Sequence, residues 1–255
     1  MKKLYCIPVV ALVLLVAVVI MYKMAIGKAF ESEVSLYEEK YSVDNEKDTL
    51  DLIRVPGYLE LLRERSLLNS QLQLAKDDSI GLALGLRDSV AELVVKGVVV
   101  TRFSLKEIGV SPLFSRLSPE SRYELLSEPW VITEAESTIS REPLNVIQAP
   151  KDTSEIIPFV VPDTTHSEPV FFTLSTDKGV DLCFYQVDSK TKEDKVRERA
   201  IARREAREQY RAFMNYILDG KAMTYKPVIR IGMNKVDAKV LYRALPSRGL
   251  VAVSF

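Results

Sequence analysis

The chain has few of the residues that form disulfide frameworks and metal centres. Its 255 residues include two cysteines, Cys6 and Cys183, and one histidine, His166. Two cysteines cannot make a disulfide framework, and we expect both to be free thiols because Cys6 begins a long apolar run. A single histidine excludes a histidine-rich metal site within one chain. We therefore expect neither a metal centre nor a bound cofactor.

An excess of positive charge is also missing. The chain has 35 lysines and arginines and 35 aspartates and glutamates, so its formal net charge is zero. Nucleic-acid-binding domains are strongly basic, and we expect no nucleic-acid partner. General disorder is excluded by a composition of 47% hydrophobic and 27% charged residues, which is ordinary for a globular protein.

One apolar run stands out at the N-terminus, over residues 7–22. The hydrocarbon core of a bilayer needs about 20 helical residues. Because Lys23 can extend its ammonium group to the interface, residues 5–26 are predicted to form a transmembrane helix. The alternative is a cleaved signal peptide, whose apolar region usually has only about 7–15 residues. We therefore expect a membrane as one partner of this chain, contacted through residues 5–26.

The orientation of that helix follows from its flanks. Lysines lie on both sides, but the short N-terminus and the acidic residues after the run favour an N-terminus in the cytoplasm. The expected location is the cell membrane, crossed once, with the domain outside. The expected division is a transmembrane anchor at 1–28, a polar stalk at 29–56 and an extracytoplasmic α+β domain at 57–255.

Strands are predicted wherever apolar residues alternate with polar or small ones. Turn residues such as Lys96-Gly97 separate the first strands into a meander, and Thr176-Asp177-Lys178-Gly179 separates the two strands of a hairpin. The predicted strands are 80–86, 90–95, 98–105, 170–174, 180–187, 227–231 and 250–255.

Helices are predicted at 58–76, 119–126, 190–218 and 236–245. Ser118 is a typical N-cap for the second of these, with a proline at the next position. In the first, Leu61, Leu68 and Leu72, with Leu62 beside them, form one apolar stripe. This stripe favours a helix that packs on the following domain over a coiled-coil dimer, because too few heptads are present.

The longest predicted helix, 190–218, is rich in charge and basic in its first half. Its second half has an apolar face formed by Tyr210, Phe213, Met214 and Ile217. A solvated helix face explains the charges better than a surface for an anionic polymer. The predicted fold class is therefore α+β, a mainly β core with a long charged helix, preceded by one N-terminal transmembrane helix.

Cys183 is the candidate nucleophilic thiol, and it could pair only with His166. A catalytic thiol needs a nearby cation or helix N-terminus to lower its pKa, and the sequence around Cys183 offers neither. We interpret Cys183 as a buried structural thiol, Asp77-Asp78 as turn residues that end a helix, and Trp130 as an anchor into the core. No catalytic, cofactor-binding or metal-binding residue is predicted.

Two stretches resemble a known family. The residues IRIGMNKVDAKVLYRALPSRGLVAVSF, from Ile229 to Phe255, are similar to the C-terminal end of L,D-transpeptidase (YkuD-type) catalytic domains. Those domains have an arginine-containing strand, then an Asp-Ala-x-x-Leu-Tyr helix, then a proline, a glycine and a final hydrophobic strand. The resemblance places the following residues at those positions: Arg230, Asp237, Ala238, Leu241, Tyr242, Pro246 and Gly249. The meander from Ile80 to Leu105 is similar to the opening strands of the same domains.

The resemblance stops where the family's chemistry begins. A Ser-His-Gly-Cys motif stands before the arginine strand in those enzymes, whereas residues 224–228 here are Thr-Tyr-Lys-Pro-Val. The resemblance therefore implies a degenerate, non-catalytic relative, and an enzyme is disfavoured. We expect a membrane-anchored envelope protein that binds cell-wall polymer or an envelope protein. The alternative is a structural or assembly component that docks a protein partner through its helices.

Overall fold

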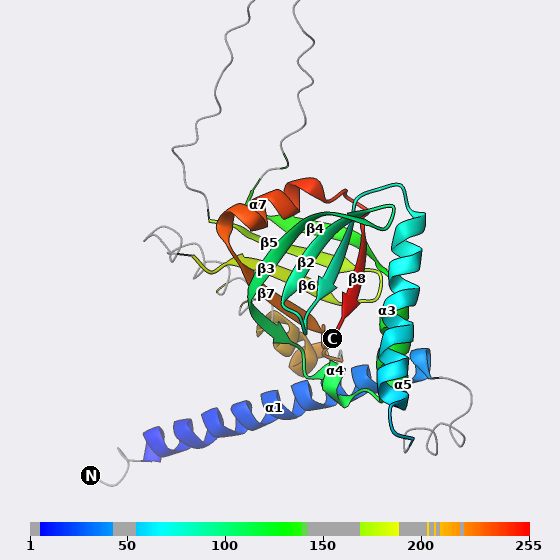
Figure 1. The fold of residues 1–255 in the computed structure, drawn as a ribbon. Coiled ribbons are helices and arrows are strands. Elements are labelled where there is room, and N and C mark those ends of the chain that lie inside the picture. The colour runs from blue at the N-terminus through cyan, green and yellow to red at the C-terminus, as the bar shows by residue number, and fades with distance from the viewer. Residues whose placement is uncertain are drawn as a thin grey trace, which may run out of the picture.

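The computed structural model describes residues 6–42, 55–139, 141, 169–188, 203, 207, 210–219 and 222–255, with side chains from residue 16 onwards. Its centre is a closed barrel in the strand order β1-β2-β3-β7-β6-β5-β4-β8 (Figure 1). The strands are β1 (Gly81–Gly85), β2 (Val90–Val95), β3 (Val98–Val110), β4 (Trp130–Ser137), β5 (Phe171–Thr176), β6 (Asp181–Gln186), β7 (Val228–Met233) and β8 (Leu250–Ser254).

The last strand closes the barrel. β8 pairs with β1 in parallel, with Val251 opposite Leu82, and with β4 in antiparallel fashion, with the same Val251 opposite Trp130. On the far side of the barrel, β6 and β7 form the second parallel pair, in which Leu182 lies opposite Ile229. Every strand in the described part of the chain therefore has two neighbours, and none of them forms an unpaired sheet edge.

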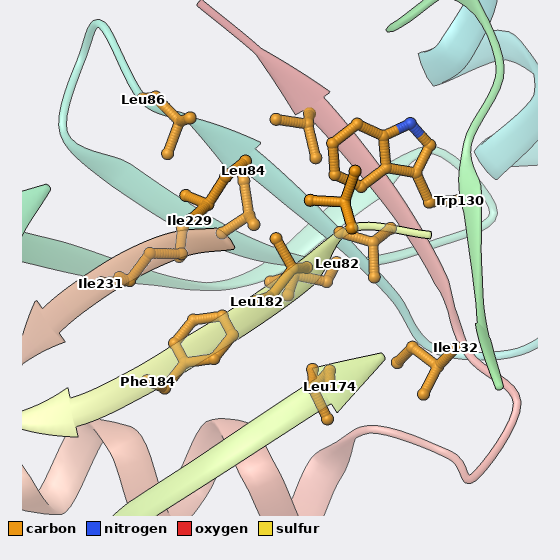
Figure 2. Packing of buried hydrophobic residues seen from close by; sticks show 14 of the residues in the cluster. Leu82, Leu84, Leu86, Trp130, Ile132, Leu174, Leu182, Phe184, Ile229 and Ile231 are labelled. Carbon is orange, nitrogen blue, oxygen red and sulfur yellow. The ribbon is translucent and has the colours of Figure 1, made fainter. Parts of the chain in front are cut away.

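The barrel interior is filled by side chains. Inward-facing residues of all eight strands form one apolar cluster, and Trp130, Phe172 and Phe184 within it are fully buried. Figure 2 shows Trp130 and Phe184 among the surrounding leucines and isoleucines. The rings of Phe172 and Phe184 stack with their centroids 4.6 Å apart, and the indole nitrogen of Trp130 donates to the carbonyl of Leu125 at 3.1 Å. Eight strands leave an interior just wide enough for side chains, so this barrel is a packed core.

Helices surround the barrel: α1 (Cys6–Tyr41), α3 (Tyr58–Lys76), α4 (Leu113–Arg116), α5 (Pro119–Ser127) and α7 (Lys235–Ala244). Ser118 caps α5 by accepting a hydrogen bond from the backbone amide of Ser121, as the sequence predicts. α7 packs Ala238, Leu241 and Tyr242 into the main core at one end of the barrel (Figure 1).

α1 continues as one helix across residue 28 and is held on the barrel by its C-terminal half. Phe30 packs edge-on against Tyr225, and the hydroxyl of Tyr37 donates to the carbonyl of Lys178. The carboxylate of Glu38 accepts hydrogen bonds from the amide and hydroxyl of Ser118 and from the hydroxyl of Ser121. Because Ser118 begins α5, the acidic side chain also meets the positive end of that helix. These contacts fix the direction of α1 relative to the barrel.

α3 confirms the predicted helix but packs through the opposite face. Its buried residues are Ser66, Ser70 and Leu74, which lie towards α5 and β8. The stripe predicted to pack, formed by Leu61, Leu68 and Leu72, is exposed. Serines allow two elements to approach closely, so the small side chains, rather than the large ones, mark the contact surface.

Most predicted strands and short helices are confirmed, with β3 longer than expected and Trp130 inside the barrel. Of the helix predicted at 190–218, most of the first half lies outside the described residues, whereas 210–219 are helical and bury Phe213 against Tyr22 of α1.

The predicted fold class is wrong. The strands close into a barrel, because β8 pairs with both β1 and β4, whereas the expectation was an α+β fold with a mainly β core and a long charged helix. The expected N-terminal transmembrane helix is also corrected. In the described part of the chain, no helix is both long enough and apolar enough to cross a membrane.

Candidate functional site

The two outer sides of the barrel differ in what covers them. α3 packs over β1, β2 and β8, where the outward-facing residues are small or apolar, including Ala83, Val94 and Ala252. Outward-facing side chains of β3, β5, β6 and β7 are mostly polar and half-buried or exposed. We call this second surface the polar face and define it by Glu107, Thr173, Ser175, Asp181, Cys183, Tyr185 and Arg230.

Strand alternation and register bring these residues together. Buried and half-buried positions alternate strictly along β5 and β6, so Thr173 and Ser175 point outward with Asp181 and Cys183. Ser175 is opposite Asp181, Thr173 is opposite Cys183, and Cys183 is in turn opposite Arg230 on β7. Residues from distant parts of the sequence therefore lie in rows across neighbouring strands.

The first row contains a hydrogen-bonded trio. The Asp181 carboxylate accepts from the hydroxyl of Ser175 at 2.7 Å and lies 2.8 Å from the ammonium nitrogen of Lys226. The Lys226 ammonium also reaches the Ser175 hydroxyl oxygen at 3.4 Å. A serine nucleophile needs a base to accept its proton. Both groups beside Ser175 are engaged with each other in the ion pair between Asp181 and Lys226, so we interpret the trio as a binding or structural arrangement.

Cys183 lies in the second row and is half-buried, whereas the sequence predicts a buried thiol. Its sulfur is 3.5 Å from the hydroxyl of Thr173, and its neighbours Leu182 and Phe184 are buried on the opposite side of β6, as predicted. His166, the only histidine with which Cys183 could pair, lies outside the described residues. The described surroundings of the thiol therefore contain no imidazole base.

The third row joins Tyr185 to Glu107 across β7. The tyrosine hydroxyl donates to the Glu107 carboxylate at 2.8 Å, and its ring passes over Gly232. A Cβ atom at Gly232 would lie 2.9 Å from Glu107 Cβ and 3.1 Å from the Tyr185 ring, so glycine permits this contact. Partial burial, followed by the hydrogen bond and negative charge of Glu107, raises the pKa of Tyr185 to about 12.

Arg230 is the cation of the polar face that remains available. Its side chain is exposed, and it forms no ion pair with any residue that the structure describes. Gly109 lies opposite it on β3, so no side chain covers it from that strand. The neighbouring acids already have partners, since Asp181 pairs with Lys226 and Glu107 accepts from Tyr185. Arg230 can therefore bind an external carboxylate through its guanidinium fork.

The positions that carry the resemblance to L,D-transpeptidases are spread over the molecule. Arg230 is on the polar face, whereas Leu241 and Tyr242 of α7 are buried at the barrel end. In the segment before β7, where the family has its nucleophile, the Tyr225 hydroxyl is 2.7 Å from the Ser111 hydroxyl and its ring packs on α1. This segment therefore packs against α1 and contains no thiol.

The other residues considered from the sequence have structural roles. Asp77 ends α3 and accepts hydrogen bonds from the amide and hydroxyl of Ser79, which lower its pKa. It is therefore a turn residue, as predicted. Within the described ranges, no group of histidine, cysteine or acidic residues has the arrangement of a metal site.

Sequence reasoning missed the trio of Ser175, Asp181 and Lys226. The alternation in 171–176 and 181–186 would have placed Ser175 and Asp181 on one side of a hairpin. The alternation could not have shown that Lys226 lies beside them. Lys226 is brought there by the pairing of β6 with β7, and about forty residues separate these two strands in the sequence.

No protein-family model, curated protein or solved structure matches this chain. The resemblance to L,D-transpeptidases therefore stays a prediction from the residues alone.

Proposed function

We propose that this protein is a non-catalytic binding module of the cell envelope whose polar face holds cell-wall polymer. The proposal depends on one observation, the exposed guanidinium of Arg230, which has no acidic partner among the described residues and lies opposite Cys183 on β6 and Gly109 on β3. The proposal also rests on a location in the cell envelope, outside the cytoplasm, which stays a prediction from the sequence.

The chemistry of the face suits such a polymer. Peptidoglycan carries carboxylates on its peptides and hydroxyls on its sugars. Arginine binds carboxylates in a bidentate manner, and Thr173, one strand beyond Cys183, offers a hydroxyl that can donate or accept. The Tyr185 ring, held by Glu107, adds a flat surface beside the guanidinium.

Two features support binding over catalysis. Among the described residues, the polar partners of the possible nucleophile Ser175 are Lys226 and the Asp181 carboxylate, which are already joined in an ion pair. The interior of the barrel is occupied by fully buried side chains such as Phe172 and Phe184, so a substrate is expected to contact the outside surface.

Co-sedimentation of the full chain with purified peptidoglycan sacculi tests the proposal. Saturable binding is expected, and Arg230→Ala should weaken it by about tenfold, the loss expected for a charge-assisted hydrogen bond. Arg102→Ala is the matched control, because Arg102 is exposed on β3 but pairs with Glu92 at 2.6 Å. Absence of binding by the folded chain, or an equal loss in both variants, would contradict the proposal.

A second candidate function is an assembly component that docks a protein partner through its helices. It is favoured by α3, whose Leu61, Leu68 and Leu72 side chains are 65%, 56% and 58% exposed. The apolar side chains of α1 from Val16 to Met24 are exposed as well. If this function holds, substitutions on α3 should abolish assembly while Arg230→Ala leaves it unchanged.

A further inference from the structure

The exposed side of α3 has a regular arrangement. At about 100° per residue, Leu61, Leu68 and Leu72 fall within about 40° of one another around the helix. We call these three residues the outer stripe. Ser66, Ser70 and Leu74, which pack against the rest of the molecule, lie on the opposite side of the helix. Figure 1 accordingly shows α3 at the margin of the molecule, with the barrel on one side of it.

Between Leu61 and Leu68, two charged residues flank the outer stripe, one on each side. Glu64 lies about 60° to one side of Leu61 and Arg65 about 40° to the other. Both are exposed, and neither forms an ion pair with a described residue; the one ion pair within α3 joins Arg63 to Glu60 at 3.0 Å. The helix therefore presents a row of leucines between an acid and a base.

We propose that the outer stripe binds the outer stripe of a second copy of this chain, with the two α3 helices parallel. This inference names a partner for the assembly function and does not depend on binding of cell-wall polymer. A two-fold axis is the commonest symmetry of protein oligomers, and it requires a surface that is complementary to itself.

The charges decide the direction of the helices. In a parallel pair the two-fold axis runs along the helices, so the Glu64 side of one copy faces the Arg65 side of the other. Each acid then meets a base at nearly the same height, twice in the dimer. In an antiparallel pair centred between these residues, Glu64 would meet Glu64 and Arg65 would meet Arg65. Opposite charges attract and like charges repel at such distances, so the parallel arrangement is favoured.

The contact is small. α3 has 19 residues, which span about 28 Å at 1.5 Å per residue, and one helix pair buries less than the roughly 800 Å² per partner of a standard interface. The dimer is therefore expected to be concentration-dependent, which makes covalent trapping the suitable first measurement.

Cysteine crosslinking of the full chain tests the pairing and its direction. In a background with Cys6→Ser and Cys183→Ser, Leu68→Cys alone should give a disulfide-linked dimer under mild oxidation, because parallel helices place the two 68 positions opposite each other. Leu61→Cys alone should do the same. Gln73→Cys, exposed on α3 but off the stripe, is the control and should remain monomeric.

The outcomes separate the alternatives. Crosslinking only when Leu61→Cys and Leu68→Cys chains are mixed would show antiparallel helices and overturn the proposed arrangement. Equal crosslinking by Gln73→Cys, or none by any variant at high protein concentration, would overturn the pairing itself. Circular dichroism checks that each variant is folded.

Charge reversal gives an independent readout. By sedimentation velocity, Glu64→Arg or Arg65→Glu alone should weaken dimerisation by about fivefold, whereas the double variant, which restores opposite charges across the axis, should recover most of it. Arg230→Ala should leave the dimer unchanged, so failure of polymer binding and failure of self-association are distinguishable. Equal weakening by the single and double variants would contradict the proposed contact.

Discussion

The two outer sides of this barrel are built from the same kind of strand and serve different ends. On the covered side, Gly81, Ala83, Val94 and Ala252 are small or apolar, and Leu74 of α3 packs against them. On the polar face, hydroxyls, acids and the exposed guanidinium of Arg230 occupy the corresponding outward positions. The interior is alike on both sides, because every strand contributes apolar residues to a single core.

The difference teaches that the outward-facing residues of a strand decide whether that part of the barrel packs against a helix or forms a polar surface. The inward-facing residues do not distinguish the two sides. Burial of apolar area holds α3 in place, and a polar group under it would lose its water without a partner. On the polar face the same polar group can form hydrogen bonds with water or with neighbouring side chains. The outward-facing residues can therefore be replaced there without loss of the fold.

The largest effect on the free energy of unfolding is expected when a polar residue is placed on the side that α3 covers. Ala252→Asp places a carboxylate under α3 at a position only 3% exposed. An uncompensated buried charge costs about 3–5 kcal/mol, so the free energy of unfolding should fall by about that amount. Thr173→Asp on the polar face should cost about 1 kcal/mol or less. Urea unfolding followed by Trp130 fluorescence measures both, and equal losses would show that the polar face is covered.

A smaller effect separates the two faces of α3 itself. Leu74→Ala removes a side chain that is 3% exposed and leaves a cavity against Val94 and Ala252, which should cost about 2–4 kcal/mol. Leu72→Ala, on the same helix, removes a side chain that is 58% exposed and should change the free energy of unfolding by about 0.5 kcal/mol or less. Measurements at low protein concentration keep self-association out of the comparison. A similar loss in both would contradict the observed helix orientation.

The attachment of α1 combines an apolar contact with a polar one, and Glu38 tests the polar part. Glu38→Gln replaces one acceptor oxygen by a donor, so at least one charge-assisted bond from Ser118 or Ser121 is lost, at a cost of about 1.5–3 kcal/mol. Glu39→Gln is the control, since Glu39 is exposed. Amide hydrogen exchange over residues 30–41 should speed up only in the first variant, and unchanged exchange would show that Phe30 and Tyr37 hold α1 without it.

Local patterns in the sequence predict much of this fold. Alternation over 170–187 identifies the β5–β6 hairpin, and Ser118 with the proline after it identifies the start of α5. The face of α3 is predicted wrongly because three leucines give the stronger periodic signal, while its true contact surface contains Ser66 and Ser70. Hydrophobicity alone cannot show that a helix is held by close approach of small side chains.

Closure and the polar face depend on pairings that no local pattern contains. Leu82 meets Val251 across nearly the whole domain, and neither strand differs in sequence from one at the edge of an open sheet. Arg230 reaches Cys183 only through the parallel register of β6 with β7. The sequence could show which residues point outward, but the strand order was needed to show which of them are neighbours.

The smallest expected effect is a shift in titration on the polar face. Tyr185 should ionise with a pKa of about 12 instead of its ordinary 10.0, mainly through partial burial and then through Glu107. Because the folded-state pKa is the higher one, the stability contributed by neutral Tyr185 is complete below about pH 10 and is lost as the pH rises towards about 12.

The difference in absorbance at 295 nm between the wild type and Tyr185→Phe isolates the titration of this tyrosine. Glu107→Gln should lower the midpoint towards 10 without reaching it, because burial remains, whereas Glu92→Gln on β2 should leave it unchanged. An unshifted midpoint in the Glu107 variant would show that burial alone holds the proton, and that the hydrogen bond across Gly232 does not shape this face.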